Sequence, residues 1–197
     1  MPWENKVKEY LVSTEKLSNP AVVGLAGFGG TTLLLQFHNL GWCGAGPVFW
    51  CAVFFGGLAQ LVAGLQESKT GNNFGFAVFT TYGAFWMALA GILASAKYGW
   101  MDINTTDIGW FLVIFTVLTL MYFVGAMKQN YMLSFTFLTL LAGFICLDIS
   151  HLGGPAILTE VAAIVLIVCA LSSWYMMLHI VFQDLGWNLP MGKPWIK

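Results

Sequence analysis

Six apolar stretches, each long enough to cross a lipid bilayer, dominate this sequence. About 20 apolar residues in a helix span the hydrocarbon core of a bilayer. Short links that carry glycine, asparagine, serine or lysine separate the stretches. We expect the spans at residues 20–40, 47–66, 74–96, 107–127, 131–149 and 154–183. The sequence therefore predicts an all-α polytopic membrane protein with six transmembrane helices in a bundle.

The small number of charged residues supports this class and excludes several others. Only 9% of the 197 residues are charged, whereas a soluble domain carries about 25%. The chain has no arginine and a net charge of -1, which argues against a nucleic-acid partner. The cysteines stand singly in apolar surroundings, and no HExxH motif, phosphate loop or nucleophile–histidine–acid set is present. We therefore expect no enzyme, no cofactor and no metal site.

The lysines predict how the chain is oriented in its membrane. Seven of the eight lysines fall in the segments at one end of the six spans, and Lys97 alone falls at the other end. Lysine-rich loops face the cytoplasm, so both termini should be cytoplasmic in a cell membrane. We divide the chain into a cytoplasmic segment 1–18, a transmembrane domain 19–186 and a cytoplasmic tail 187–197. The first segment is interpreted as a short amphipathic helix on the membrane surface or as a mostly disordered tail.

Neutral polar residues inside the spans indicate a path through the bundle. In the first span, Phe28, Thr31 or Thr32, Gln36 and Asn39 fall on one helical face. Polar groups in a membrane usually face the bundle interior or a water path, although a single threonine can bond back to its own helix. Candidate pore-lining residues of the six spans are Asn19, Thr31, Thr32, Gln36, Asn39, Gln60, Thr81 and Ser172.

The ends of the spans carry two further signals. Asn19 suits the N-cap of the first helix and Pro20 its first position, which would point free N–H groups at an incoming anion. Glu160 and Asp148 are the carboxylates expected inside spans. A carried proton is one interpretation of both, and stabilisation of a helix N-terminus is the favoured interpretation of Glu160.

Three sequence blocks resemble the acetate uptake transporter family, which includes the succinate–acetate permeases. They are NPAVVGL with GFGGTTLLLQFHNLG at 19–41, FFGGLAQLVAGLQESKTGNNFG at 54–75, and FTTYGAFW at 79–86. The resemblance implies a six-helix bundle with its own pore, assembly as a homo-hexamer, and transport of acetate or succinate across the cytoplasmic membrane. Gln36 departs from the asparagine that is usual at its position.

The resemblance also implies roles for single residues. It places a pore constriction at Phe28, Tyr82 and Leu140, and polar pore residues at Thr31 and Gln60. Ser172 falls at the position linked with substrate choice. An apolar constriction would exclude hydrated ions and favour a partly dehydrated or protonated acid, while threonine, glutamine, asparagine and tyrosine donors would hold a carboxylate weakly.

Three functions remain open at this point. The first is a permease or channel for acetate and other small carboxylates. The second is a channel for a small neutral solute such as urea, which a hexameric pore would also suit. The third is a membrane sensor or assembly component that transports nothing.

Overall fold

The computed structural model describes Trp3 and residues 18–197 of the chain. Within them, six helical spans are long and apolar enough to cross a membrane, as the sequence predicted. They are α2 (Ala21–Asn39), the second span formed by α3 (Ala45–Val53), η1 (Phe54–Ala59) and α4 (Gln60–Thr70), then α5 (Asn73–Tyr98), α6 (Thr105–Ala126), α7 (Tyr131–His151) and α8 (Ile157–Asp184). The surface helix considered for residues 1–18 lies outside the described residues, apart from Trp3 and Ser18.

Asparagine caps set the start of three of these helices. The Oδ1 atoms of Asn72, Asn104 and Asn130 accept hydrogen bonds of 2.9–3.0 Å from the backbone N–H three residues on. Such caps satisfy donors that a helix N-terminus leaves free. Gly71 and Gly99, with φ of +76° and +66°, end the preceding helical segments in the left-handed region that glycine adopts without strain.

The first helix begins one residue later than the sequence predicted. Pro20 holds the N-cap position, and α2 starts at Ala21. Asn19 nevertheless accepts a 2.9 Å hydrogen bond from the backbone N–H of Ala21 through Oδ1. The Asn19 side chain therefore bonds the backbone N–H of Ala21, one of the N–H groups that we expected to be free for an anion.

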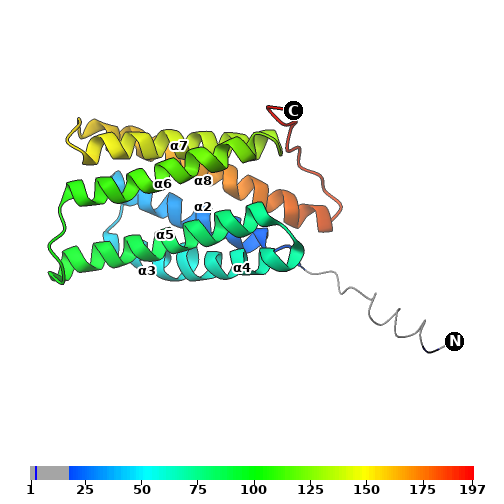
Figure 1. Cartoon of the computed structure of the whole chain (residues 1–197), viewed down its shortest axis with the longest axis horizontal. Helices are drawn as coiled ribbons and strands as arrows, with labels where there is room; N and C mark the ends of the chain where they lie inside the picture. Colours follow the sequence, from blue (N-terminus) through cyan, green and yellow to red (C-terminus); the bar gives the residue numbers. More distant parts are fainter. Residues whose placement is uncertain (1–2, 4–17) are drawn as a thin grey trace.

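The six spans form a ring. Consecutive spans pack against one another, and α2 packs along α8, which closes the ring between the first span and the last. In Figure 1 the start of α2 and the C-terminus lie at the same end of the bundle. We call this the lysine-rich end, because Lys69 in the last turn of α4 lies there together with Lys128, Lys193 and Lys197, while Lys97 lies at the opposite end.

The second span contains a π-helical turn that fits against the glycines of α2. The turn η1 covers FFGG and the two residues after it, and π turns in α-helices often mark functional positions. A Cβ at Gly56 would lie 2.5 Å from Thr31 Oγ1, and one at Gly27 would collide with the carbonyl of Phe55. The glycines of the first span thus allow backbones to touch, as small residues do between membrane helices.

The outside of the ring is apolar. The helix α6 exposes Ile114, Leu120 and Met121, and α8 exposes Ile157, Ile164 and Leu171. A soluble monomer rarely exposes so much contiguous apolar surface, whereas lipid tails accept it. Together with the six spans, this surface identifies a multi-pass membrane protein.

The C-terminal segment folds back over the lysine-rich end. The Met132 N–H donates to the carbonyl of Met191 at 3.0 Å, and the Trp195 N–H donates to that of Met127 at 2.9 Å. The indole of Trp195 also packs edge-on against the ring of Phe123. The predicted tail at 187–197 therefore covers part of the bundle instead of extending away from it.

Candidate functional site

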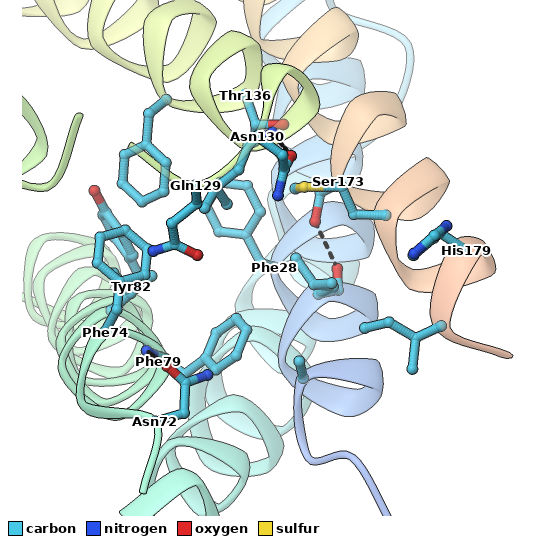
Figure 2. A pocket seen from close by; sticks show the side chains of 18 of the residues that line it. Phe28, Asn72, Phe74, Phe79, Tyr82, Gln129, Asn130, Thr136, Ser173 and His179 are labelled. Carbon is cyan, nitrogen blue, oxygen red and sulfur yellow. Dashed lines mark hydrogen bonds between the residues drawn. The ribbon is translucent and has the colours of Figure 1, made fainter. Parts of the chain in front are cut away.

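Two cavities lie inside the ring, one toward each end of the bundle. Each has a volume of about 160 Å³. We call the one toward the lysine-rich end the lysine-side cavity and the other the far cavity. Figure 2 shows the lysine-side cavity, with Phe28, Tyr82, Thr136 and Ser173 among the side chains that surround it.

Phe28, Tyr82 and Leu140 stand where the two cavities meet. They line both cavities, and no other described residue does. Their exposed fractions are 6%, 1% and 4%. The rings of Phe28 and Tyr82 lie 5.8 Å apart between centroids and are tilted by 57°. The helices α2, α5 and α7 thus bring together the three residues that the family resemblance had singled out; we call them the collar.

The Tyr82 hydroxyl points away from the cavities. It lies 2.7 Å from Thr119 Oγ1 on α6, and the Thr119 hydroxyl itself donates to the carbonyl of Phe115 at 2.6 Å. Because the Thr119 hydrogen is already used, Tyr82 must be the donor to Thr119. In this geometry the Tyr82 hydroxyl is engaged within the protein, and Tyr82 contributes its ring face to the collar.

Gln60 is the buried amide of the lysine-side cavity. It follows the π turn, is fully buried, and lines the cavity. Neither its Nε2 nor its Oε1 has a hydrogen-bond partner. Leaving such a group unpaired costs about 1–3 kcal/mol, so this amide is available to a solute or water in the cavity.

A polar rim that the sequence did not reveal surrounds the lysine-side cavity. Asn72, Gln129, Asn130 and His179 line it. Asn72 Nδ2 donates at 2.9 Å to Glu67 Oε2, and Glu67 is only 2% exposed. Asn72, Gln129 and Asn130 lie between helices, and His179 lies near the end of α8. Periodicity within the spans therefore did not single them out.

The polar residues of the far cavity divide into paired and unpaired groups. Gln36 Nε2 donates to the carbonyl of Thr32 at 3.1 Å, and Gln36 Oε1 accepts from Asn39 Nδ2 at 2.9 Å. Thr32 Oγ1 and Trp86 Nε1, by contrast, are buried without a partner. All four residues line the cavity. Trp86 was not among the predicted site residues, although it lies one helical turn beyond Tyr82.

Four other candidate residues lie outside the lining of both cavities. Thr31 Oγ1 is 3.3 Å from the Cys51 sulfur, between the first two spans. Thr81 Oγ1 is 2.9 Å from the Tyr122 hydroxyl on α6. Ser172 donates to the carbonyl of Cys169 at 2.7 Å and lies 2.8 Å from Thr136 Oγ1, a cavity residue. Asn19 lines a separate hollow beside Lys69 and Thr70.

The two carboxylates differ in their surroundings. Asp148 is 9% exposed; its Oδ2 accepts a 2.6 Å hydrogen bond from Thr116, and its Oδ1 has no partner. Glu160 is exposed and lies in the first turn of α8, at the end of the span and not inside it as expected, because that helix begins only at Ile157. This position is the one expected for an acid that stabilises a helix N-terminus.

The lining chemistry suits a small solute with a polar end and an apolar end. Amide, hydroxyl, indole and imidazole groups stand among aliphatic and aromatic side chains, and no lysine of the described part of the chain lines either cavity. Neutral donors hold an anion more weakly than a lysine or arginine would. Weak binding is what passage through a pore requires.

Comparisons with known proteins agree with this geometry. The model of the GPR1/FUN34/yaaH family matches residues 5–186. The succinate–acetate/proton symporter SatP of Escherichia coli (strain K12) is 39% identical over 182 residues, which cover 90% of this chain and 97% of that protein. Acetate permease A of Emericella nidulans is 30% identical over 83% of this chain and 61% of its own length. A solved structure of the bacterial acetate channel SatP superposes with a TM-score of 0.86 at 39% identity, covering 90% of this chain and all of that one.

Proposed function

Because the chain belongs to the GPR1/FUN34/yaaH family, we propose that it carries acetate and other small carboxylates, succinate among them, across a membrane. Its relatives are named as a succinate–acetate/proton symporter, an acetate permease and an acetate channel. The observation that carries the proposal is the path itself. Two cavities of equal volume, lined by polar and apolar side chains without lysine, meet at one collar inside a ring of six helices. A transport path of this kind needs no catalytic group.

The collar is the proposed constriction of the pore. Phe28, Tyr82 and Leu140 present two ring faces and one aliphatic chain. Moving a hydrated ion through an apolar constriction carries a large desolvation free energy. The desolvation free energy is smaller for a partly dehydrated carboxylate or a protonated acid, because its methyl group gains apolar contact there. The collar therefore selects small monocarboxylates against inorganic ions.

Gln60 is the proposed substrate contact on the lysine-side of the collar. Its amide is buried, unpaired and part of the cavity wall, so its N–H groups can bond a carboxylate without breaking a bond in the protein. Gln36 and Asn39 line the other cavity as a bonded pair. We assign Thr31, Thr81 and Ser172 to the support of the pore wall, and Asn19 to the start of α2.

Asp148 is the better candidate of the two carboxylates for a coupled proton. It lies within a span, is nine-tenths buried and has an unpaired oxygen, whereas Glu160 is exposed at a helix start. Acetate flux against an imposed pH gradient at fixed voltage tests coupling. Flux that follows the acetate gradient alone, in wild type and in Asp148→Asn alike, would exclude this role.

The proposed setting is a homo-hexamer in the cytoplasmic membrane with a pore in each subunit. The lysine-rich end faces the cytoplasm under the positive-inside rule, which puts both termini there. In this arrangement residues 19–186 form the transport domain, 1–18 precede it on the cytoplasmic side, and 187–197 cap the lysine-side mouth.

Uptake by purified protein in proteoliposomes tests the function. Labelled acetate and labelled urea are supplied side by side, at one pH and one ionic strength. We expect saturable acetate uptake well above that of empty liposomes and little urea uptake. Phe28→Ala should widen the collar and raise succinate uptake relative to acetate by about tenfold, the equivalent of 1.4 kcal/mol in the barrier.

Two outcomes would contradict the proposal. Urea uptake without acetate uptake would indicate a neutral-solute channel. Uptake of neither solute by protein that is monodisperse and correctly inserted would indicate a membrane component without transport activity. A matched variant, Val117→Ala, removes an exposed apolar side chain on α6 and should leave the acetate-to-succinate ratio unchanged.

A further inference from the structure

Two buried donors lie at the same level of the far cavity, one helical turn beyond the collar. Thr32 follows Phe28 by four residues on α2, and Trp86 follows Tyr82 by four residues on α5. Residues four apart share a helix face and lie about 6 Å apart along the axis. Both helices run from the lysine-rich end toward the opposite end (Figure 1), so both donors lie on the far side of the collar.

The Thr32 hydroxyl differs from other threonines in the bundle. Thr116, Thr119 and Thr136 each donate to the backbone carbonyl four residues earlier, at 2.6–3.1 Å. Thr32 makes no such bond; its Oγ1 is buried, unpartnered and part of a residue that lines the far cavity. Its exposed fraction is 3%. A threonine in a helix usually uses this back-bond, so the hydroxyl of Thr32 is free to bond a group that enters the cavity.

The Trp86 indole shows the same contrast. Trp174 in α8 uses its indole N–H to donate to the carbonyl of Ala26 at 3.3 Å. Trp86 is 3% exposed, and its Nε1 has no partner although the residue lines the far cavity. Buried tryptophan N–H groups usually find an acceptor. The indole N–H of Trp86 therefore has no bond within the protein to give up if an acceptor enters the cavity.

An apolar wall completes this level. Phe144 follows Leu140 by four residues on α7 and also lines the far cavity. The three collar helices therefore contribute two free donors and one aromatic ring at the next turn. The nearby amide of Gln36 is already bonded to Thr32 O and to Asn39, and the Nδ1 atoms of His38 and His151, which also line the cavity, lie 3.0 and 2.9 Å from the backbone carbonyls of Cys43 and Leu147. Thr32 Oγ1 and Trp86 Nε1 are the buried polar side-chain atoms of this lining that have no partner.

We propose that Thr32 Oγ1–H and Trp86 Nε1–H form a carboxylate-binding site immediately beyond the collar in the far cavity, with Phe144 against the alkyl end of a small monocarboxylate. The inference rests on the proposed function for the identity of its ligand. The two donors replace water around the carboxylate oxygens before the substrate enters the apolar collar. No lysine of the described chain lines this cavity, so the site binds weakly and releases its ligand readily.

The indole signal of Trp86 tests the site without measuring transport. Full-length protein carrying ¹⁵N-labelled tryptophan is placed in lipid nanodiscs, and the Trp86 resonance is assigned with Trp86→Phe. Sodium chloride is then exchanged for sodium acetate at constant ionic strength. We expect a saturable shift of the Trp86 indole N–H, while the Trp174 resonance stays in place.

A pair of threonine variants sharpens this test. Thr32→Val removes the hydroxyl and keeps the shape of the side chain; it should raise the half-saturating acetate concentration by about tenfold, the loss expected for a hydrogen bond to a charged acceptor. Thr80→Val is the matched control, because its hydroxyl donates to the carbonyl of Phe76 and the residue lines neither cavity. A Trp86 resonance that acetate does not move, or a Thr32→Val titration equal to that of wild type, would overturn the inference.

Acetate uptake separates this inference from the proposed function. Wild type that takes up acetate while its Trp86 resonance is unmoved leaves the function standing and removes the site. Wild type that shows the saturable shift but no uptake keeps the site and removes the permease. If both hold, uptake by Trp86→Phe and Thr32→Val should half-saturate at about tenfold higher acetate than wild type, as expected for one lost bond.

Discussion

The two cavities have the same volume but differ in what their polar groups are doing. The lysine-side cavity has a rim of amide side chains and one unpaired buried amide, Gln60. The far cavity has an equally polar lining, but Gln36 and Asn39 bond to each other, and its buried side-chain atoms without a partner are Thr32 Oγ1 and Trp86 Nε1. A count of polar residues would rank the two cavities alike. The hydrogen bonds show instead that a few unpaired groups next to the collar are available to a solute.

This difference shows that a donor in the cavity wall can bind a solute only if it is not already hydrogen-bonded within the protein. Tyr82 illustrates this most clearly. Its ring lies in the collar, but its hydroxyl is hydrogen-bonded to Thr119 on α6 and is not available to a solute. Ser173 lines the lysine-side cavity, yet its hydroxyl donates to the carbonyl of Leu25 at 2.9 Å, as the dashed line in Figure 2 shows. Groups of this kind hold helices together and should matter for stability more than for binding.

Blocking the collar should have the largest effect, because it separates the two cavities. Leu140→Trp places an indole where the cavities meet, and we expect acetate uptake to fall more than tenfold. Ile145→Trp on the exposed face of the same helix is the control and should keep at least half of the uptake. Overpacking a buried site costs about 1–3 kcal/mol of stability, so thermal unfolding of both variants is measured alongside. Normal uptake by a folded Leu140→Trp protein would show that the solute takes another route.

Two glutamine variants compare an unpaired with a paired amide. Gln60→Leu removes an amide that has no partner in the protein, so acetate half-saturation should rise about fivefold while stability changes little. Gln36→Leu leaves Asn39 Nδ2 without its acceptor, so stability should fall by about 1–2 kcal/mol while half-saturation changes less than twofold. The opposite pattern, with Gln36 controlling binding and Gln60 controlling stability, would break the distinction between the cavities.

Removing the Tyr82 hydroxyl should have the smallest effect on transport. Tyr82→Phe keeps the ring in the collar and removes one hydrogen bond to Thr119, so we expect uptake within twofold of wild type. Stability should fall by about 1 kcal/mol, the usual net value of one such bond, and thermal unfolding in detergent measures it. A loss of acetate uptake comparable to that of Leu140→Trp would mean that the hydroxyl turns toward the solute during transport.

Much of the architecture could be predicted from local sequence. Each span is a run of apolar residues of bilayer length, and each of the predicted six is present. The family resemblance named Phe28, Tyr82 and Leu140, and these residues lie at the junction of the cavities. Boundaries were less accurate, as the starts of α2 and α8 show, because proline and glycine near a helix start permit more than one first residue.

The helical face of the first span was only partly predicted. Thr31 and Thr32 are adjacent and could not be ranked by periodicity, yet one bonds toward the second span and the other faces the far cavity. Trp86 could have been found from the sequence, because it follows Tyr82, a predicted collar residue, by four positions and so falls on the same helix face. Glu67 and the residues of the polar rim could not be found in this way. Their surroundings depend on how the helix ends and the links between them pack against one another.

What the sequence determined by itself is the number, position and membrane character of the helices, because bilayer thickness and the cost of burying charge act on each segment separately. The distribution of lysines also predicted a direction for the bundle. Only the tertiary structure decided which polar groups face a cavity with a hydrogen bond to spare. Whether a polar group is already bonded depends on partners from other helices, such as Thr119 for Tyr82 and Ala26 for Trp174. A hydrogen bond between residues far apart in the chain has no local sequence pattern, so the free donors at Gln60, Thr32 and Trp86 became visible only when every other bond was in place.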